Sequence, residues 1–322
     1  MTGTIGVDLG GTKIQTVTLV DGVVVGSNRE LTPQSGADDV ITAMVESIRA
    51  SITDASLTLA DISGIGIGSP GRIDSAKGTV ENSPNVPGFL QRVPMAQLIA
   101  QELGGPLPVI DNDIRVAVRG ERQHGGLAGY RDAIGVFMGT GVGGGLIIGG
   151  VLDSGRGGAG EIGHVIVKPG GRRCGCGGLG HLEAYAGRAS MEVHAQHLVA
   201  QGRHTILFDL MEKKGRTRLS SSVWASALKR NDRMAIQLLH QAAWAMSTAL
   251  ASIQNLLDVE AIMIGGGLGD RLGEPFIDDV RARMLPLLLS SENPPKLLAT
   301  TLQDLSGAVG AAVLAQDAAA GR

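Results

Sequence analysis

The spacing of apolar residues along the chain predicts short buried strands that alternate with amphipathic helices. In the first third, apolar runs typical of buried strands lie at residues 4–7, 14–19, 23–25, 62–67 and 109–110. Apolar residues recur with helical spacing over 38–52 and 93–103, which predicts one helix in each range. Asp21-Gly22, between the second and third runs, is a hairpin signal.

The stretch from Ala133 to Leu152 is uncharged and about as long as a membrane-spanning helix. It contains eight glycines, which would make a helix costly in backbone entropy. We therefore expect a strand, a glycine turn and a second strand. Further along, the pattern predicts a long helix over 232–257, a strand over 261–264 and a small-residue helix over 307–320.

One eight-residue pattern occurs twice. Ile5-Gly-Val-Asp-Leu-Gly-Gly-Thr aligns with Ile134-Gly-Val-Phe-Met-Gly-Thr-Gly, and each copy leads into a hairpin at the same offset. This repeat predicts two related α/β halves that face each other. We expect a smaller domain over 1–115, completed by the C-terminal helix at 305–322, and a larger domain over 116–304.

Composition and charge narrow the range of partners. The 322 residues carry a net charge of −3, and aromatic residues make up 2%. Neither a long-range field nor stacking platforms favour nucleic acid or an anionic membrane, so we expect neither as a partner. The N-terminus lacks the basic start and apolar core of a signal peptide, and a Cys-x-Cys pair suits a reducing compartment. We expect a cytoplasmic protein.

Three glycine-rich loops each follow an expected strand. Glycine lets backbone N–H groups approach phosphate oxygens without a Cβ in the way, and threonine or lysine side chains there add donors. Asp8 could hold a hydrated Mg²⁺ at the phosphates. The residues expected to bind a nucleotide are Asp8, Gly10, Gly11, Thr12, Lys13, Gly139, Thr140, Gly141, Gly143, Gly144, Gly266 and Gly267.

Two common nucleotide-binding motifs do not account for these loops. The chain has no G-x-x-x-x-G-K-[ST] segment, so it carries no P-loop motif. Gly66–Gly71 and Gly139–Gly144 match G-x-G-x-x-G, but a dinucleotide fingerprint requires a helix at the last glycine. Here each match leads into residues typical of a strand or turn. The sequence therefore disfavours a dinucleotide-binding dehydrogenase.

Four nitrogen and sulfur donors lie close together in the middle of the chain: His164, Cys174, Cys176 and His181. Four such donors are the ligand count of a tetrahedral structural zinc site. Two carboxylates, Glu161 and Glu183, bracket the set and are not needed as ligands. We expect a metal site that positions polar side chains beside a pocket.

The combination of motifs resembles the ROK family (repressors, open reading frames, sugar kinases) over essentially the whole chain. The motifs, in order, are Asp8-x-Gly-Gly-Thr-Lys, Pro70-Gly71, Asn112-Asp113, Gly139-Thr-Gly-x-Gly-Gly, Glu161-x-Gly-His164 and Cys174-x-Cys176-Gly. The resemblance implies an α/β fold of the actin-like ATPase type shared with hexokinases. It also implies two domains that close over sugar and ATP, and usually a homodimer.

The resemblance assigns roles to individual residues. Asp113 falls on the family's catalytic base and Asn112 on a residue that hydrogen-bonds the sugar. Glu161 and Glu183 fall on sugar-binding glutamates. His164 falls on a residue that gives one ring nitrogen to zinc and offers the other to a sugar hydroxyl. Gly71 is expected to let the backbone approach the sugar.

Two positions depart from the family pattern. The third zinc cysteine is replaced by His181, which leaves a Cys2His2 set as a feasible alternative. Ile114-Arg115 stands where the family commonly has a small residue and then asparagine. Arg115 could pair with Asp113 and lower its pKa, or it could point along the helix to solvent or to the phosphates.

The function implied is an ATP-dependent hexose kinase that makes a sugar 6-phosphate, with glucose as the first expected substrate. Kinases of N-acetylglucosamine, N-acetylmannosamine and fructose share nearly all these motifs and stay open as alternatives. A catalytically silent sugar-binding protein is a further alternative because of Arg115. Repressors of the family carry a winged helix-turn-helix ahead of the first motif, which starts here at Thr4, so we expect no DNA-reading domain.

Overall fold

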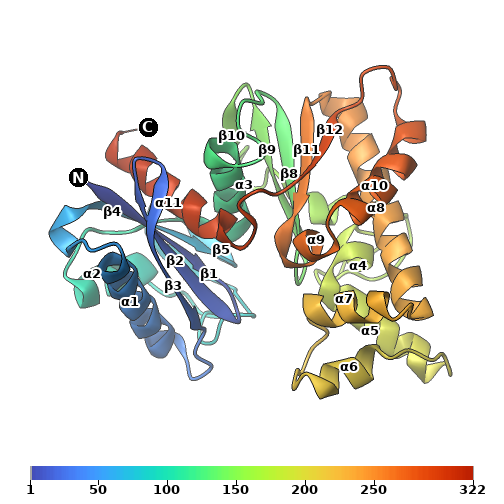
Figure 1. The fold of residues 1–322 in the computed structure, drawn as a ribbon, viewed down its shortest axis with the longest axis horizontal. Coiled ribbons are helices and arrows are strands. Elements are labelled where there is room, and N and C mark those ends of the chain that lie inside the picture. Colours follow the sequence, from blue (N-terminus) through green and yellow to red (C-terminus); the bar gives the residue numbers. More distant parts are fainter. Residues whose placement is uncertain (1, 322) are drawn as a thin grey trace. The chain divides into compact units, whose positions relative to one another are not determined.

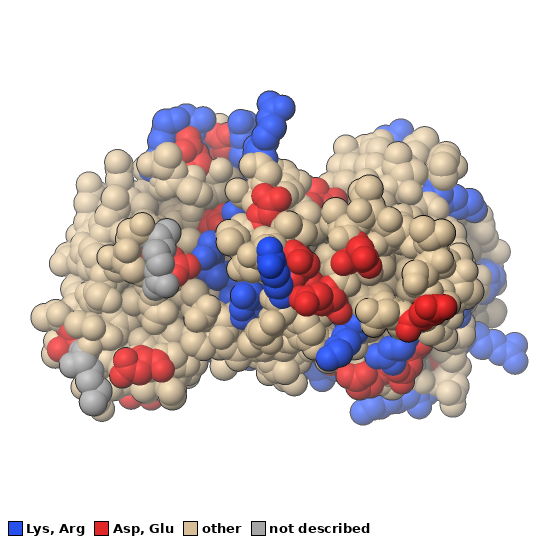
Figure 2. All heavy atoms as spheres, turned by 90° about the horizontal axis from the view of Figure 1, so that it is seen from above, with Lys and Arg blue, Asp and Glu red and all other residues tan. Residues whose placement is uncertain are grey.

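A computed structural model describes residues 2–321, and the chain forms two compact units. The first unit is Met1–Ala128 together with Asp304–Arg322, and the second is Gly129–Gln303. Across the described residues, no helix is long and apolar enough to cross a membrane. On the face drawn in Figure 2, acidic and basic side chains lie interspersed, as the small net charge predicts.

The first unit is built on a sheet of five strands in the order β3-β2-β1-β4-β7. These strands are β1 (Gly3–Leu9), β2 (Lys13–Val20), β3 (Val23–Leu31), β4 (Ile62–Ser69) and β7 (Val109–Asn112). The first three pair antiparallel, whereas β4 and β7 run parallel to β1. Asp21 and Gly22 both have positive φ, of 49° and 80°, which confirms the predicted hairpin between β2 and β3.

Helices cover both faces of this sheet (Figure 1). The helices α1 (Ala37–Asp54) and α2 (Met95–Leu103) bury their apolar stripes in a core with β1 and β4. The opposite face carries α11 (Ser306–Ala319), which also packs against α3 (Asp113–His124). A short hairpin of β5 (Arg72–Asp74) and β6 (Thr79–Glu81) follows β4. The unit is therefore completed by the last helix of the chain.

Glycines let α11 approach its neighbours at backbone distance. A Cβ on Gly6 of β1 or on Gly66 of β4 would overlap the carbonyl oxygens of Ala308 and Ala311 respectively. A Cβ on Gly310 would overlap the backbone of Val116 in α3. The small residues expected in the C-terminal helix therefore have a packing reason, because larger ones would hold the backbones apart.

The second unit repeats the topology of the first. Its sheet has the order β10-β9-β8-β11-β12, with three antiparallel strands followed by two parallel ones. The strands are β8 (Ala133–Met138), β9 (Val142–Ile148), β10 (Val151–Asp153), β11 (Ala261–Gly265) and β12 (Lys296–Ala299). Ile5 pairs with Ile65 across the parallel strands, and Ile134 pairs in the same way with Ile262. This correspondence confirms the internal repeat.

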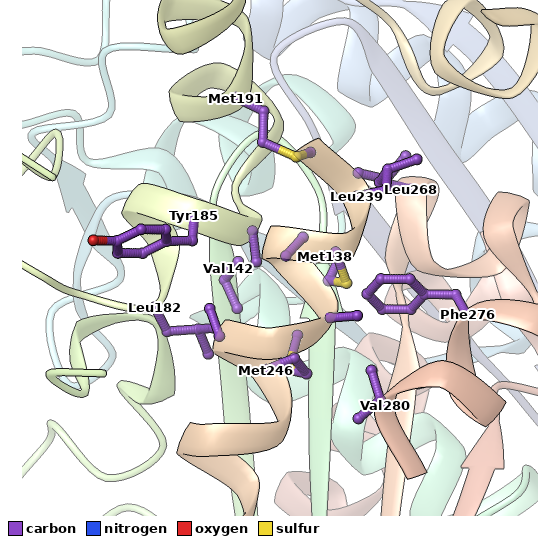
Figure 3. Close-up of a cluster of buried hydrophobic side chains, with 14 of the residues drawn as sticks. Met138, Val142, Leu182, Tyr185, Met191, Leu239, Met246, Leu268, Phe276 and Val280 are labelled. Atoms are coloured by element: carbon purple, nitrogen blue, oxygen red, sulfur yellow. The ribbon is translucent and has the colours of Figure 1, made fainter. Parts of the chain in front are cut away.

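Most helices of the second unit lie in the segments after β10 and after β11. They are α4 (Glu183–Ala186), α5 (Arg188–Ala200), α6 (Leu207–Lys213), α7 (Ser221–Lys229), α8 (Arg233–Leu257), α9 (Gly266–Leu272) and α10 (Glu274–Met284). Asp232 caps α8 by accepting from the backbone N–H of Ala235 at 2.8 Å, so the helix begins where predicted. Figure 3 shows the core that α8 shares with α4, α9 and α10.

The predicted strands and helices are found, most with differences of a few residues at their ends, but β3 continues to Leu31 where the prediction stopped at Val25. The uncharged 133–152 stretch is a strand, a glycine turn and further strands, as expected. Both G-x-G-x-x-G matches lead into strands, β5 and β9, so neither opens a helix. The periodicity did not predict the strands β5, β6 and β12, the helices α3 to α7, α9 and α10, or the 3-10 helices at Leu59–Asp61, Ile162–His164, Leu285–Leu287 and Gln303–Leu305. Several of these segments are short, and α5, although it has 13 residues, buries only Met191, Glu192 and Ala195, so tertiary contacts rather than an apolar stripe fix it. Gly266 and Gly267, expected in a loop, begin α9.

The close contact of α11 gives a stability prediction. We expect Gly66→Ala to lower the free energy of unfolding by about 3 kcal/mol, because the new methyl group overlaps a backbone carbonyl that no rotamer can move. Gly158→Ala is the control, since a Cβ there meets no atom within 4 Å. Urea denaturation measures both variants, and equal stability of the two would contradict the packing argument.

Candidate functional site

The junction between β7 and α3 presents the predicted catalytic carboxylate. Asn112 caps α3, and its Oδ1 accepts from the N–H groups of Ile114 and Arg115 at 3.0 and 3.2 Å. Asp113 is the first residue of the helix and is partly buried. An aspartate after a strand is often only a helix cap, but here Asn112 performs that task. Asp113 adds a contact of its own at this turn, because its Oδ1 also accepts from the N–H of Ile114 at 3.0 Å.

Arg115 pairs with Asp111, one helical turn before it. Its Nε lies 3.3 Å from Oδ1 of Asp111, and both side chains are less than one-fifth exposed. The same Asp111 oxygen accepts from the N–H of Asn112 at 2.8 Å. The sequence left Asp113, solvent and the phosphates open for Arg115, whereas the structure shows an ion pair with Asp111, which was not predicted.

Asp8 ends β1 beside several charges of the first unit. Burial, and next the neighbouring carboxylate of Asp113, raise the pKa of Asp8 to about 7, while Lys13 acts in the opposite direction. Lys13 itself lies 3.1 Å from Asp304, which also accepts from Arg29 at 2.8 Å. A carboxylate held so near its neutral form is well suited to exchange its proton for a cation.

Two glycines of the first unit have local reasons for being glycine. Gly71 has a φ of 104°, and a Cβ there would approach the carbonyl of Glu81 and the side chain of Ser83. A Cβ on Gly11 would overlap the carbonyl oxygen of Asn85. The local turn therefore accounts for Gly71 without a bound sugar. Whether it also approaches a sugar stays a prediction.

The four predicted metal donors come together in the second unit. Ligand atoms of His164, Cys174, Cys176 and His181 all lie within 4.8 Å of one another. Cys174 is buried and Cys176 exposed, and the Cys176 sulfur lies 3.3 Å from Nδ1 of His181. The rings of the two histidines pack edge to face at 5.4 Å. His181 thus lies with the other three donors, as the sequence predicts.

His164 stands between the metal donors and a predicted sugar ligand. Its Nδ1 lies 4.0 Å from the sulfur of Cys174, whereas its Nε2 lies 3.8 Å from Oε2 of Glu161. Both Glu161 and His164 are exposed. One ring nitrogen of His164 therefore faces the donor cluster and the other faces Glu161. A histidine that binds a metal and also contacts a sugar needs this orientation.

Glu183 connects the donor cluster with the second glycine loop. Its Oε2 accepts from the N–H of Val142 at 3.0 Å, and its Oε1 accepts from the Cys174 thiol at 3.3 Å. A Cβ on Gly141 would overlap this carboxylate. The carboxylate that the sequence predicts as a sugar ligand thus also fixes the glycine loop.

The flanks of the second glycine loop are anchored in the core. Met138 and Val142, on either side of the loop, point into the apolar cluster of Figure 3. Between them Gly139 donates to the carbonyl of Gly141 at 2.9 Å, and Thr140 is exposed. A Cβ on Gly139 meets no atom within 4 Å. The loop is therefore held firmly at its ends and open at its tip.

Two side chains that contact these loops had no signal in the sequence. Asp304 precedes α11 and pairs with Lys13, although it lies 291 residues further along the chain. Arg188 begins α5 and donates to the hydroxyl of Thr140 at 3.0 Å. No motif or periodicity marks either position, because both depend on contacts between distant segments.

Comparison with known proteins identifies the family. The ROK family description matches residues 4–318. A glucokinase of Thermotoga maritima is 31% identical over 318 residues, 97% of each chain. An N-acetylmannosamine kinase of Salmonella typhi is 30% identical over 322 residues, 97% of this chain and 98% of the other. The crystal structure of a ROK family glucokinase from Streptomyces griseus in complex with glucose and AMPPNP superimposes with a TM-score of 0.80, at 31% identity over 98% of this chain and 99% of that one.

These matches confirm the predicted fold, the α/β actin-like ATPase fold of the hexokinase type. They extend over the segments that carry Asp8, Asp113, the glycine loops and the four metal donors. The chain belongs to the ROK family.

Proposed function

We propose that this protein is an ATP-dependent hexose kinase that transfers a phosphoryl group to the 6-hydroxyl of a sugar, with glucose as substrate. The observation that carries the proposal is its similarity, over nearly the full chain, to glucokinases, one of them solved with glucose and AMPPNP. The N-acetylmannosamine kinase of Salmonella typhi matches almost as well, so that sugar is the second candidate. N-acetylglucosamine and fructose follow as substrates of related chemistry.

Asp113 is the proposed general base. Phosphoryl transfer relies mainly on positioning and electrostatics, and the protein must accept the proton of the attacking hydroxyl. The cap formed by Asn112 fixes the backbone on which Asp113 stands. The sequence allowed Arg115 to pair with Asp113, which would weaken Asp113 as a base. Arg115 pairs with Asp111 instead, and this supports an active enzyme over a silent sugar-binding protein.

The sugar ligands proposed are Asn112, Glu161, His164 and Glu183. These groups suit the hydroxyls of a hexose, because a carboxylate accepts from a hydroxyl and an amide or imidazole can accept or donate. His164 supports this assignment through the orientation of Nε2 toward Glu161. Glu183 would share its carboxylate between the sugar and the N–H of Val142.

The glycine loops and Asp8 are proposed to bind ATP and Mg²⁺. The open tip at Gly139 and the exposed Thr140 support phosphate contacts from the second unit. In the first unit, Asp8 and Lys13 supply a carboxylate for hydrated Mg²⁺ and a cation for phosphate. Mg²⁺, when bound, would neutralise charge on the transferred phosphoryl group.

The donor cluster is proposed to hold structural zinc through His164, Cys174, Cys176 and His181. Two sulfurs and two imidazoles gathered within 4.8 Å fit the donor preference and ligand count of zinc. The metal would fix the tautomer and orientation of His164 beside Glu161.

We also propose that the protein forms a homodimer, as the resemblance implies. The second unit exposes several large apolar side chains that a partner could cover, among them Val193, Leu256 and Leu289.

Asp113→Asn tests the base. We expect kcat for glucose to fall about 10³-fold, because an amide cannot accept the hydroxyl proton, while glucose affinity changes little. A coupled ADP-release assay over glucose, fructose and both N-acetylhexosamines measures turnover, and calorimetry measures sugar binding. Asp21→Asn, in the exposed hairpin between β2 and β3 of the same unit, is the control. Unaltered turnover of the Asp113 variant, or no turnover of any hexose by the wild type, would contradict the proposal.

Zinc binding is tested at His181. We expect the purified protein to contain about one zinc per chain, His181→Ala to lose it and His181→Cys to retain it, since thiolate and imidazole are both zinc ligands. Elemental analysis measures the metal, and a chelator should lower the melting temperature of the wild type. Full zinc content in His181→Ala would show that this histidine is not a ligand.

The raised pKa of Asp8 predicts a pH-dependent stability difference. Between about pH 4 and pH 7 the folded protein holds a proton that the unfolded chain has lost, so this residue destabilises the fold increasingly as pH rises. Without divalent cations, Asp8→Asn should therefore gain melting temperature relative to the wild type on going from pH 5 to pH 8. A constant difference across that range would count against the shift.

A further inference from the structure

Arg188 joins the second glycine loop to α7. Its Nη2 donates to the hydroxyl of Thr140 at 3.0 Å, and its Nη1 donates to the hydroxyl of Ser221 at 2.9 Å. Thr140 lies at the tip of the glycine loop, and Ser221 is the first residue of α7. One planar guanidinium thus spans two hydroxyls that belong to segments about 80 residues apart.

Backbone contacts fix Arg188 relative to the loop. The N–H of Arg188 donates to the carbonyl of Gly139 at 3.2 Å, and the N–H of the next residue, Ala189, donates to that of Thr140 at 2.9 Å. The start of α5 is therefore bonded along the edge of the loop. These bonds fix the backbone at Arg188, and the hydroxyls of Thr140 and Ser221 hold its guanidinium.

The third glycine segment reaches the same place. A Cβ on Gly267, at the start of α9, would lie 3.7 Å from the hydroxyl of Ser221. The neighbouring Gly266 has a φ of 83°, and a Cβ there would approach the backbone of Met138 just before the loop. Both glycine segments of the second unit, 139–144 and 266–267, therefore meet near Arg188.

The carboxylate of Glu192 acts on the charge of Arg188 through space, and the guanidinium of Arg218 opposes it. Both oxygens of Glu192 are engaged by Nε of Arg218, at 3.0 and 3.1 Å, and one of them also accepts from the N–H of Leu219. Within residues 2–321, no carboxylate forms an ion pair with Arg188, and its side chain contacts are hydroxyls. Burial lowers the pKa of Arg188, although a guanidinium stays protonated at neutral pH. A partly buried cation whose side-chain hydrogen bonds go to hydroxyls is suited to an anionic ligand.

We propose that Arg188 is a nucleotide-binding residue whose guanidinium contacts the phosphate oxygens of the nucleoside triphosphate at the Gly139–Gly144 loop. The arginine fork matches phosphate in a bidentate manner, and the hydroxyls of Thr140 and Ser221 hold the fork in place from the protein side. This inference rests on the proposed function, because it takes the anion to be the phosphate tail of the kinase's nucleotide.

Calorimetry with two ligands tests the inference. AMPPNP with Mg²⁺ carries the triphosphate tail, whereas adenosine lacks it and is measured by competition. We expect Arg188→Met to weaken AMPPNP binding about 30-fold and to leave adenosine affinity within twofold, because a bond between charged groups is lost only for the phosphates. Arg188→Lys, which keeps the charge without the fork, should lose about fivefold and guards against misfolding of the methionine variant.

Arg283→Met is the matched control, since Arg283 lies in the same unit, is similarly exposed and pairs with Asp279 at 2.8 Å. Unchanged AMPPNP affinity in both Arg188 variants would overturn the inference. Equal losses for AMPPNP and adenosine would also overturn it, because they would show that Arg188 only shapes the loop. Failure of the wild type to bind AMPPNP would instead refute the proposed function on which the inference rests.

Discussion

Backbone contact between α11 and its neighbours is the constraint on which the first unit depends. Gly6 and Gly66 lie against carbonyl groups of α11, and Gly310 lies against α3. Through this contact, a helix from the C-terminal end of the chain covers one face of the sheet. Gly307 of the same helix lies close to Asp8, because a Cβ on Gly307 would lie 2.6 Å from the carboxyl carbon of Asp8. The helix that completes the core therefore also buries Asp8, and burial is what raises its pKa.

In the second unit, a single irregular segment supports two chemical features. The donor cluster holds one end of this segment, and Glu183 reaches from it to the N–H of Val142. A few residues later, Arg188 is bonded to the edge of the same glycine loop. Because Met138 and Val142 fix the loop ends in the core, these contacts act on a rigid scaffold. We therefore expect a substitution at the donor cluster to alter the position of the glycine loop at 139–144, through Glu183.

Much of this arrangement could be predicted because the relevant signals are local. A run of apolar residues defines a strand, and the repeated eight residues defined two sheets of one topology. The Cys-x-Cys pair and its flanking histidines lie within 18 residues of one another, so their donor atoms could be expected to come together from the sequence alone. Arg115 shows the limit of such reasoning. The sequence left Asp113, solvent and the phosphates open for it, whereas the structure pairs it with Asp111 in β7.

The amino-acid sequence by itself determined the strand and helix pattern, the duplicated halves, the family and the residue types at the glycine loops. These follow from periodicity, from the conformational freedom of glycine and from donors close in the chain. Only the tertiary structure decided that Asp304 meets Lys13, that Glu183 seats on the glycine loop and that Arg188 faces Thr140 and Ser221. Those contacts join segments far apart in the chain, and which of them form depends on how the sheets and helices pack.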